Sequence, residues 1–147
     1  MKLKKLSLKA KDLIASLLIS ATAIVGVIDF LMIFFYAPTE KTMGPVQRIF
    51  YIHVPSAWVA FLAFFVVFIS SIGYLASRRS FWDECASTAA EIGVVFCTIV
   101  LITGPIWGRK AWGVWWTWDA RLTTTLLLWS LYITYLMLRN AFAANPG

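Results

Sequence analysis

The stretch AWVAFLAFFVVFISSIGYLA, residues 57–76, decides the fold, because its 20 consecutive positions contain no charged side chain. A transmembrane helix needs about 20 predominantly apolar residues. Comparable apolar runs cover about residues 13–36, 86–106 and 122–138. We therefore expect an all-α polytopic membrane helix bundle of four transmembrane helices, in which residues 1–147 form a single transmembrane domain.

The composition excludes a soluble globular protein. Of the 147 residues, 61% are hydrophobic and 14% are charged, whereas a soluble domain is about half apolar and about a quarter charged. The formal net charge of +6 does not indicate nucleic acid here, since much of it lies ahead of the first apolar run, where cations anchor an N-terminus on the cytoplasmic face. These cations are Lys2, Lys4, Lys5, Lys9 and Lys11. We expect contact with membrane lipid and none with nucleic acid.

The first apolar run is interpreted as a retained transmembrane helix. Its lysine-rich leader and the motif Ala21-Thr22-Ala23 resemble a cleavable signal peptide. However, apolar sequence continues for about a dozen residues past that motif, and the apolar core of a signal peptide usually has only about 7 to 15 residues. The mature chain is therefore expected to keep this helix.

The positive-inside rule predicts a cytoplasmic N-terminus and places the tryptophan-rich loop, residues 107–121, on the outer face of the membrane. The basic turn after the second run and the C-terminal tail agree with this topology. The loop itself does not, because it carries Arg109, Lys110 and Arg121 against Asp119 alone. An anionic ligand on this surface would account for these cations, and lipid phosphates would account for them equally well.

The loop is unusually rich in tryptophan. Five of the eight tryptophans of the chain lie within it: Trp107, Trp112, Trp115, Trp116 and Trp118. An aromatic belt at the headgroup level is the simpler interpretation, although a belt usually needs only about one or two such residues at a helix end. If this outer-face interfacial segment is helical, Trp112, Trp115 and Trp116 share one face. Such a flat surface suits a large planar apolar ligand whose carboxylates meet the cations of the loop.

His53 is the only histidine, and it lies in RIFYIHVPSAW, residues 48–58, just before the second span. A single histidine is most often a packing or hydrogen-bonding residue. Beside a flat aromatic surface, its imidazole also suits the axial position of a haem iron. Pro55 is compatible with the first turn of the following helix, and Ser56 can form a local hydrogen bond.

Two carboxylates fall inside predicted spans, Asp29 in the first and Glu91 in the third. Intramembrane carboxylates are functional candidates by default. Each carboxylate can instead be protonated or paired inside the bundle, and pairing explains them equally well.

The spacing of the cysteines and the absence of several motifs exclude a number of protein classes. Cys85 and Cys97 lie about 18 Å apart along one predicted helix, too far to form a disulfide, and are interpreted as packing residues. Without a C-x-x-C or C-x-x-C-H motif, the chain resembles neither a thioredoxin-like reductant nor a c-type cytochrome. A P-loop, a catalytic carboxylate pair and an H-E-x-x-H motif are also absent. We do not expect the chain to be an enzyme.

The segment WGVWWTWDARLT, residues 112–123, resembles the tryptophan-rich signature of the haem-handling proteins of cytochrome c maturation. Together with residues 48–58, it is most similar to the heme exporter protein C (cytochrome c maturation protein C) family, and the resemblance covers nearly the whole chain. It implies a multi-pass protein of the bacterial inner membrane that binds haem b non-covalently and in transit. The protein would present haem to a periplasmic haem chaperone, beside an ABC transporter and a small single-span membrane protein.

The resemblance also assigns residues. The first outer-face axial histidine of the family falls on His53, and its haem-contacting signature falls on Trp112, Trp115, Trp116, Trp118 and Asp119. Arg109, Lys110 or Arg121 would meet the haem propionates. The family continues into two further spans with a second histidine, whereas this sequence ends at Gly147, so we expect it to be C-terminally incomplete. Haem held by His53 and the aromatic surface alone would bind more weakly, with an open or substituted sixth position.

Two other functions are consistent with the sequence. A structural or transport subunit would dock a protein partner through the aromatic loop without binding haem. A b-type electron-transfer cytochrome is less favoured, because buried haems in such bundles usually take paired histidines and this chain has only His53.

Overall fold

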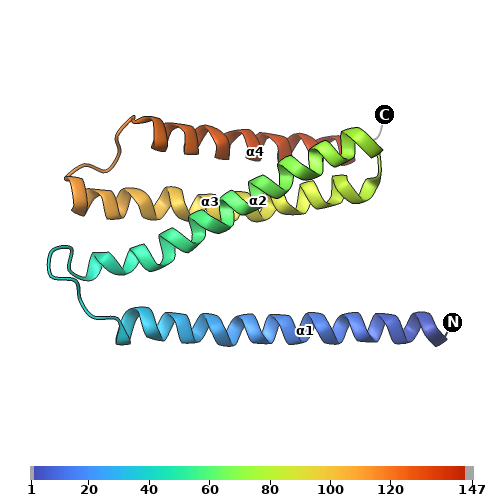
Figure 1. The fold of residues 1–147 in the computed structure, drawn as a ribbon, viewed down its shortest axis with the longest axis horizontal. Coiled ribbons are helices and arrows are strands. Elements are labelled where there is room, and N and C mark those ends of the chain that lie inside the picture. Colours follow the sequence, from blue (N-terminus) through green and yellow to red (C-terminus); the bar gives the residue numbers. More distant parts are fainter. Residues whose placement is uncertain (1, 145–147) are drawn as a thin grey trace. The chain divides into compact units, whose positions relative to one another are not determined.

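The computed structural model describes residues 2–144, with side chains described for residues 9–142. These residues form no β-strand, and their long elements are α1 (Lys2–Leu31), α2 (Phe50–Ser77), α3 (Ser80–Trp112) and α4 (Ala120–Ala144) (Figure 1). Two short helical turns, η1 (Met32–Tyr36) and η2 (Pro45–Ile49), lie between α1 and α2. The prediction of an all-α polytopic membrane protein is confirmed.

Three helical segments are long and apolar enough to cross a membrane: Lys9–Tyr36, Pro45–Ser77 and Ser80–Trp112. They contain the first three predicted spans. The fourth predicted span lies within α4, which is long enough to cross at 25 residues. Its threonine, tyrosine and tryptophan side chains lower its hydropathy, and it is not among the three segments. A crossing by α4 therefore stays a prediction.

The chain divides into two compact units, residues 1–39 and residues 40–147. The first unit consists mainly of α1, whose C-terminal end widens into the π-helical turn η1. This turn closes where the Ala37 N–H donates to the Met32 carbonyl, with an N···O distance of 2.7 Å. The second unit contains the remaining three long helices and all the predicted site residues.

A face of small residues on α3 allows α2 to approach closely. The buried members of this face are Ala86, Ala89, Ala90, Gly93 and Cys97, each of which lies three or four positions from another member. A Cβ atom added at Gly93 would lie 2.5 Å from Cε1 of Phe64 in α2, closer than packed atoms come. Small residues of this kind let transmembrane helices pack backbone against side chain. Both cysteines are free thiols, as predicted.

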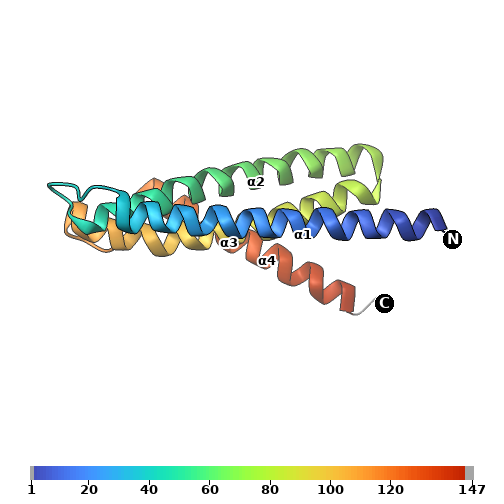
Figure 2. The same cartoon turned by 90° about the horizontal axis from the view of Figure 1, so that it is seen from below.

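The helix α4 packs against α2 and α3, and it crosses α3 at an angle (Figure 2). The Tyr132 ring stacks on the Phe64 ring of α2, with ring centroids 4.3 Å apart and an interplanar angle of 10°. Further along α4, both terminal nitrogens of Arg139 donate to the two carboxylate oxygens of Asp83, at 2.7 and 2.6 Å. This bidentate ion pair joins the end of α4 to the start of α3.

The two ends of the second unit carry different helix ends and connecting segments. The start of α2, the end of α3 and the start of α4 lie together at one end, on the left in Figure 1. The Arg78–Arg79 turn and the C-terminal end of α4 lie at the other. His53 and the tryptophan-rich segment therefore share one end of the unit, as predicted.

The predicted loop of residues 107–121 is shorter than expected, because α3 continues to Trp112 and α4 begins at Ala120. Arg109 lies in the last turn of α3, where a cation favours the helix C-terminus. Gly113 then ends the helix with φ of 78°, and its N–H donates to the Arg109 carbonyl at 3.1 Å. Trp115 and Trp116 follow in non-helical backbone, so the condition under which they would share a helix face with Trp112 is not met.

Replacing Gly93 with Ala is expected to lower the free energy of unfolding by about 1–3 kcal/mol, a typical cost of overpacking. The new methyl group would press on the Phe64 ring, whose stacking on Tyr132 hinders its displacement. Thermal unfolding in detergent measures this effect. The double variant Gly93→Ala/Phe64→Leu should recover much of the loss, and an unchanged unfolding temperature in Gly93→Ala would contradict the packing described here.

Candidate functional site

A cavity of about 310 Å³ lies where the start of α2, the end of α3 and the start of α4 meet. Small-molecule sites have volumes of about 300–1,000 Å³ and mostly apolar walls with a few polar groups. Apolar and aromatic side chains form most of this lining. The predicted site residues that line the cavity are His53, Trp112, Trp116 and Arg121.

His53 lies within the first turn of α2, because this helix begins at Phe50, earlier than the predicted second span. Pro55 is consequently past the first turn and inside the helix, which corrects its predicted position. Proline has no N–H to donate to the carbonyl of the preceding turn. The Ser56 hydroxyl donates to the Ile52 carbonyl at 2.7 Å, as the sequence predicted. The backbone around His53 is thus helical, and the hydrogen bond of the Ser56 side chain stabilises it.

The His53 imidazole rests against α3. Its Nδ1 lies 2.8 Å from the Thr103 hydroxyl oxygen, and the ring is half-buried. A Cβ atom added at Gly104 would lie 3.3 Å from the ring carbon Cε1, which is tight for a packed contact. The absence of a side chain at Gly104 therefore allows the ring to lie directly on the α3 backbone.

An aromatic wall faces the start of α4. The Arg121 guanidinium carbon lies 5.3 Å from the centroid of the Trp112 ring, within the range of a cation–π contact. The Trp107 and Trp112 rings meet edge to face, with centroids 5.3 Å apart. Trp107 in turn donates its Nε1–H to Oε1 of Gln47 in η2 at 3.3 Å. This hydrogen bond therefore links the aromatic wall, formed by Trp107 and Trp112, to η2, the segment that precedes α2.

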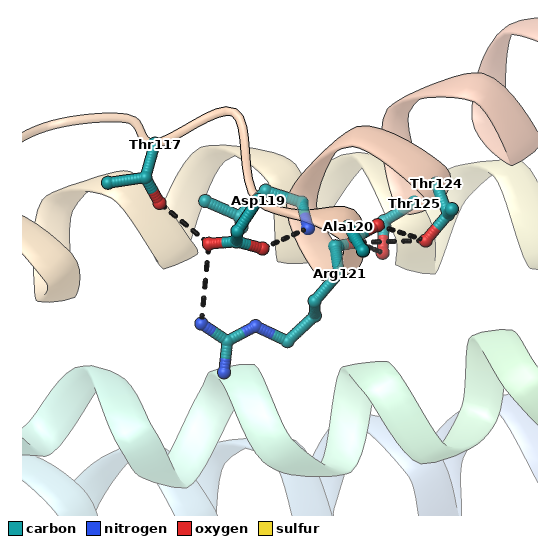
Figure 3. A network of polar contacts seen from close by, with 7 residues as sticks. Thr117, Asp119, Ala120, Arg121, Thr124 and Thr125 are labelled. Carbon is teal, nitrogen blue, oxygen red and sulfur yellow. Dashed lines mark hydrogen bonds and ion pairs between the residues drawn. The ribbon is translucent and has the colours of Figure 1, made fainter.

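Asp119 caps the N-terminus of α4 (Figure 3). Its carboxylate accepts a bond from the Leu122 N–H at 3.0 Å and one from the Thr117 hydroxyl at 2.6 Å. The Arg121 guanidinium lies 3.9 Å from the same carboxylate. The bond from Thr117 first, and then the bond from Leu122, holds the pKa of Asp119 below its ordinary value. This geometry explains Asp119 as a residue that shapes the loop and orients Arg121.

The remaining predicted site residues do not line the cavity: Trp115, Trp118, Asp119, Arg109 and Lys110. The Trp118 side chain is 77% exposed, and its ring meets the edge of Trp116 at a centroid distance of 5.8 Å. Arg109 and Lys110 are exposed in the last turn of α3, where they complement the helix dipole. Direct ligand contacts by these five residues stay predictions.

One residue that lines the cavity carries a buried polar atom without a partner. The indole Nε1 of Trp116 is inaccessible to solvent and has no hydrogen-bond acceptor among the residues that the structure describes. An unsatisfied buried N–H group is destabilising. The available donor set, an imidazole, a guanidinium and indole rings, fits a planar apolar molecule with anionic groups at its rim and a metal at its centre.

Sequence reasoning missed the residues that hold the predicted ones in place. Thr103, Gly104 and Gln47 lie far from their partners in the sequence, at separations of 50 residues for Thr103 and His53 and of 60 for Gln47 and Trp107. The polar and small residues within the third span were a usable signal. The residues that they contact could be identified only once the register of α2 against α3 was known.

Glu91 is exposed on α3, and among the residues of this unit that the structure describes it forms no hydrogen bond or ion pair. Pairing of Glu91 inside this helix bundle is therefore not found. Its function, like that of Asp29 in α1, stays a prediction.

The model of the heme exporter protein C family matches residues 4–146 of the chain. A protein named heme exporter protein C from Bradyrhizobium diazoefficiens is 41% identical over 105 residues, which cover 71% of this chain and 40% of that protein. The protein of the same name from Rhodobacter capsulatus is 38% identical over 113 residues, with coverage of 77% and 46%. That of Escherichia coli K12 is 34% identical over 122 residues, with coverage of 83% and 50%. The chain spans half or less of the length of these relatives.

Replacing Asp119 with Ala is expected to loosen the first turn of α4. Amide hydrogen exchange at Leu122 and Thr123 should accelerate several-fold, because the capping acceptor is lost, whereas Asp119→Asn should retain much of the protection. Lowering the pH should likewise reduce the protection factors of these amides, which correct for the intrinsic pH dependence of exchange. The pKa of Asp119 is depressed, so its stabilisation is present above the ordinary carboxyl range and is lost as the pH falls through the folded-state pKa. Exchange that is unchanged in Asp119→Ala would contradict the capping role.

Proposed function

The chain belongs to the heme exporter protein C family, and from this premise we propose that it binds haem b non-covalently in the cavity between α2, α3 and α4. Haem is its cargo, presented for transfer during the maturation of c-type cytochromes. The observation that carries the proposal is the convergence of His53, Trp112, Trp116 and Arg121 on one cavity from three helices and a loop.

Each of these side chains has a chemical role toward haem. The His53 imidazole supplies a nitrogen ligand to the iron. The indole rings of Trp112 and Trp116 contact the porphyrin, for which stacking and edge contacts are favourable. The Arg121 guanidinium pairs with a propionate, and Asp119 keeps it directed toward the site.

The proposed role is binding and release, without the making or breaking of covalent bonds by this chain, so it is not that of an enzyme. The haem acceptor is a periplasmic haem chaperone. The other partners are the subunits of an ABC transporter and a small single-span membrane protein. We place the protein in the bacterial inner membrane, with its N-terminus in the cytoplasm and the cavity at the periplasmic face, as the lysine-rich leader favours.

A subunit that docks a protein partner without binding haem is the rival function. An imidazole on a cavity wall favours haem, since a surface that only docks a partner needs no metal ligand. The two functions differ in whether the purified chain takes up haem.

Replacing His53 with Ala is expected to lower the haem-to-protein ratio of the chain purified in detergent and reconstituted with haem, because the iron loses its only imidazole ligand. Absorption spectroscopy in the Soret region measures both the ratio and the ligation. Wild-type haem content and spectrum in His53→Ala would contradict the ligand assignment. Absence of haem uptake by the unmodified chain would favour the docking function.

Replacing Arg121 with Gln should weaken haem retention by about tenfold, the scale expected for losing a charged hydrogen bond. Arg109→Gln is the matched control, because it removes the same charge from the same end of the unit but from outside the cavity. The release of haem to a scavenging apo-globin, followed by stopped-flow absorption, gives the rates. Equal rates for the two variants would contradict a specific pairing of Arg121 with a propionate.

A further inference from the structure

We infer that Thr103 is the positioning residue of His53 and that it fixes the imidazole as the tautomer with Nδ1 protonated and Nε2 unprotonated. The nitrogen offered to a metal is then Nε2. The tautomer follows from hydrogen bonds within the chain, and only its consequence for haem rests on the proposed function.

The direction of the bond between His53 and Thr103 follows from the second bond of Thr103. The Thr103 hydroxyl oxygen lies 2.6 Å from the Ile99 carbonyl oxygen. A carbonyl has no proton to give, so the hydroxyl proton must lie between these two oxygens. The same hydroxyl oxygen lies 2.8 Å from Nδ1 of His53 and has no second proton to offer. Nδ1–H is therefore the donor, and Thr103 accepts.

A second arrangement on α3 supports this assignment, because its donor is unambiguous. The Thr98 hydroxyl oxygen lies 2.7 Å from the Val94 carbonyl oxygen and also 2.7 Å from Nε1 of Trp129 in α4. An indole nitrogen can only donate. Thr98 thus accepts from a ring N–H while donating to its own helix, the arrangement inferred for Thr103.

The remaining nitrogen of His53 is free for a ligand. Nε2 forms no hydrogen bond with any residue that the structure describes, and His53 lines the cavity. Turning the ring over would replace the Nδ1–H donor with a carbon and leave the Thr103 oxygen without its partner. The close contact with Gly104 further restricts the ring. The chain thus presents one defined nitrogen lone pair before any ligand arrives.

The chemical nature of Thr103 also bears on release. Histidine ligands commonly donate their second N–H to a carboxylate or a carbonyl, and a carboxylate raises their basicity. A neutral hydroxyl is a weaker acceptor than a carboxylate, so Thr103 enriches the ligating nitrogen less than a carboxylate partner would. Such a ligand positions the iron without holding it as firmly as a carboxylate-paired histidine, which suits a cargo that must be handed on.

The single histidine makes the test direct. The chain labelled with ¹⁵N-histidine and purified in detergent without haem gives imidazole signals from His53 alone, provided that no histidine tag remains. At a pH where the ring is neutral, we expect a protonated Nδ1 and an unprotonated Nε2. This is the minor tautomer of histidine in water, so its dominance would reflect the protein. A spectrum dominated by protonated Nε2 would overturn the inference.

Three variants separate positioning from general stability. Thr103→Val should shift the ring toward the Nε2–H tautomer and weaken haem binding by about tenfold or more, as second-shell changes do at metal sites. Thr103→Ser should restore both properties, because it keeps the hydroxyl. Thr98→Val is the matched control, since it removes an equivalent acceptor on α3 and should leave the His53 tautomer unchanged. An unchanged tautomer in Thr103→Val would overturn the inference.

Haem binding by the same variants keeps the two proposals distinguishable. If Nδ1 is protonated but neither the unmodified chain nor Thr103→Val takes up haem, the proposed function fails and the positioning of His53 stands. If haem binds and depends on His53 but Thr103→Val alters neither the tautomer nor the iron–histidine stretching frequency in resonance Raman spectra, the function stands and the inference fails.

Discussion

The close approach of α2 to α3 sets the positions of α4 and of the candidate site. In a membrane, burial of apolar surface drives helix association weakly, since lipid is as apolar as leucine, and close packing and interhelical hydrogen bonds take its place. Gly93 and Gly104 provide that packing, because the Phe64 ring lies where a Cβ atom at residue 93 would otherwise be and the His53 ring lies close to the place of one at residue 104. One rotation and one register of α3 satisfy both contacts, and the position of α4 follows from the Phe64 ring on which Tyr132 stacks.

The same register brings polar groups together at both ends of the unit. At one end His53 meets Thr103, and at the other Asp83 meets Arg139. A polar group left without a partner in an apolar medium is costly, so each pair also disfavours alternative registers. The contacts that hold the helices in place are therefore the ones that orient the candidate haem ligand. A substitution at Gly104 that altered only the helix packing would be expected to change the site as well, because it would displace the His53 ring.

The cavity combines contacts of moderate strength, which is what a carrier requires. In the proposed role, three kinds of contact would contribute to binding: an imidazole with a hydroxyl partner, a guanidinium shared with an indole face and a carboxylate, and the tryptophan rings. None of these contacts is a covalent attachment or a carboxylate-supported ligand. In the proposed role, the acceptor protein needs to replace only a few such contacts to remove the haem.

Hydropathy, span length and the tryptophan-rich motif are local properties of the chain, so the membrane class, the first three helical spans and the family could be predicted from the sequence. The sequence also placed His53 and that motif at one end, since two successive crossings return the chain to the same side. The tertiary structure was needed to bring Trp112, Trp116 and Arg121 to one cavity with His53, and it leaves Trp115 and Trp118 outside that cavity. It also extended α3 to Trp112 and paired His53 with Thr103. These features depend on how far α3 is rotated against α2, which close packing at particular small residues sets and which no local pattern in the sequence specifies.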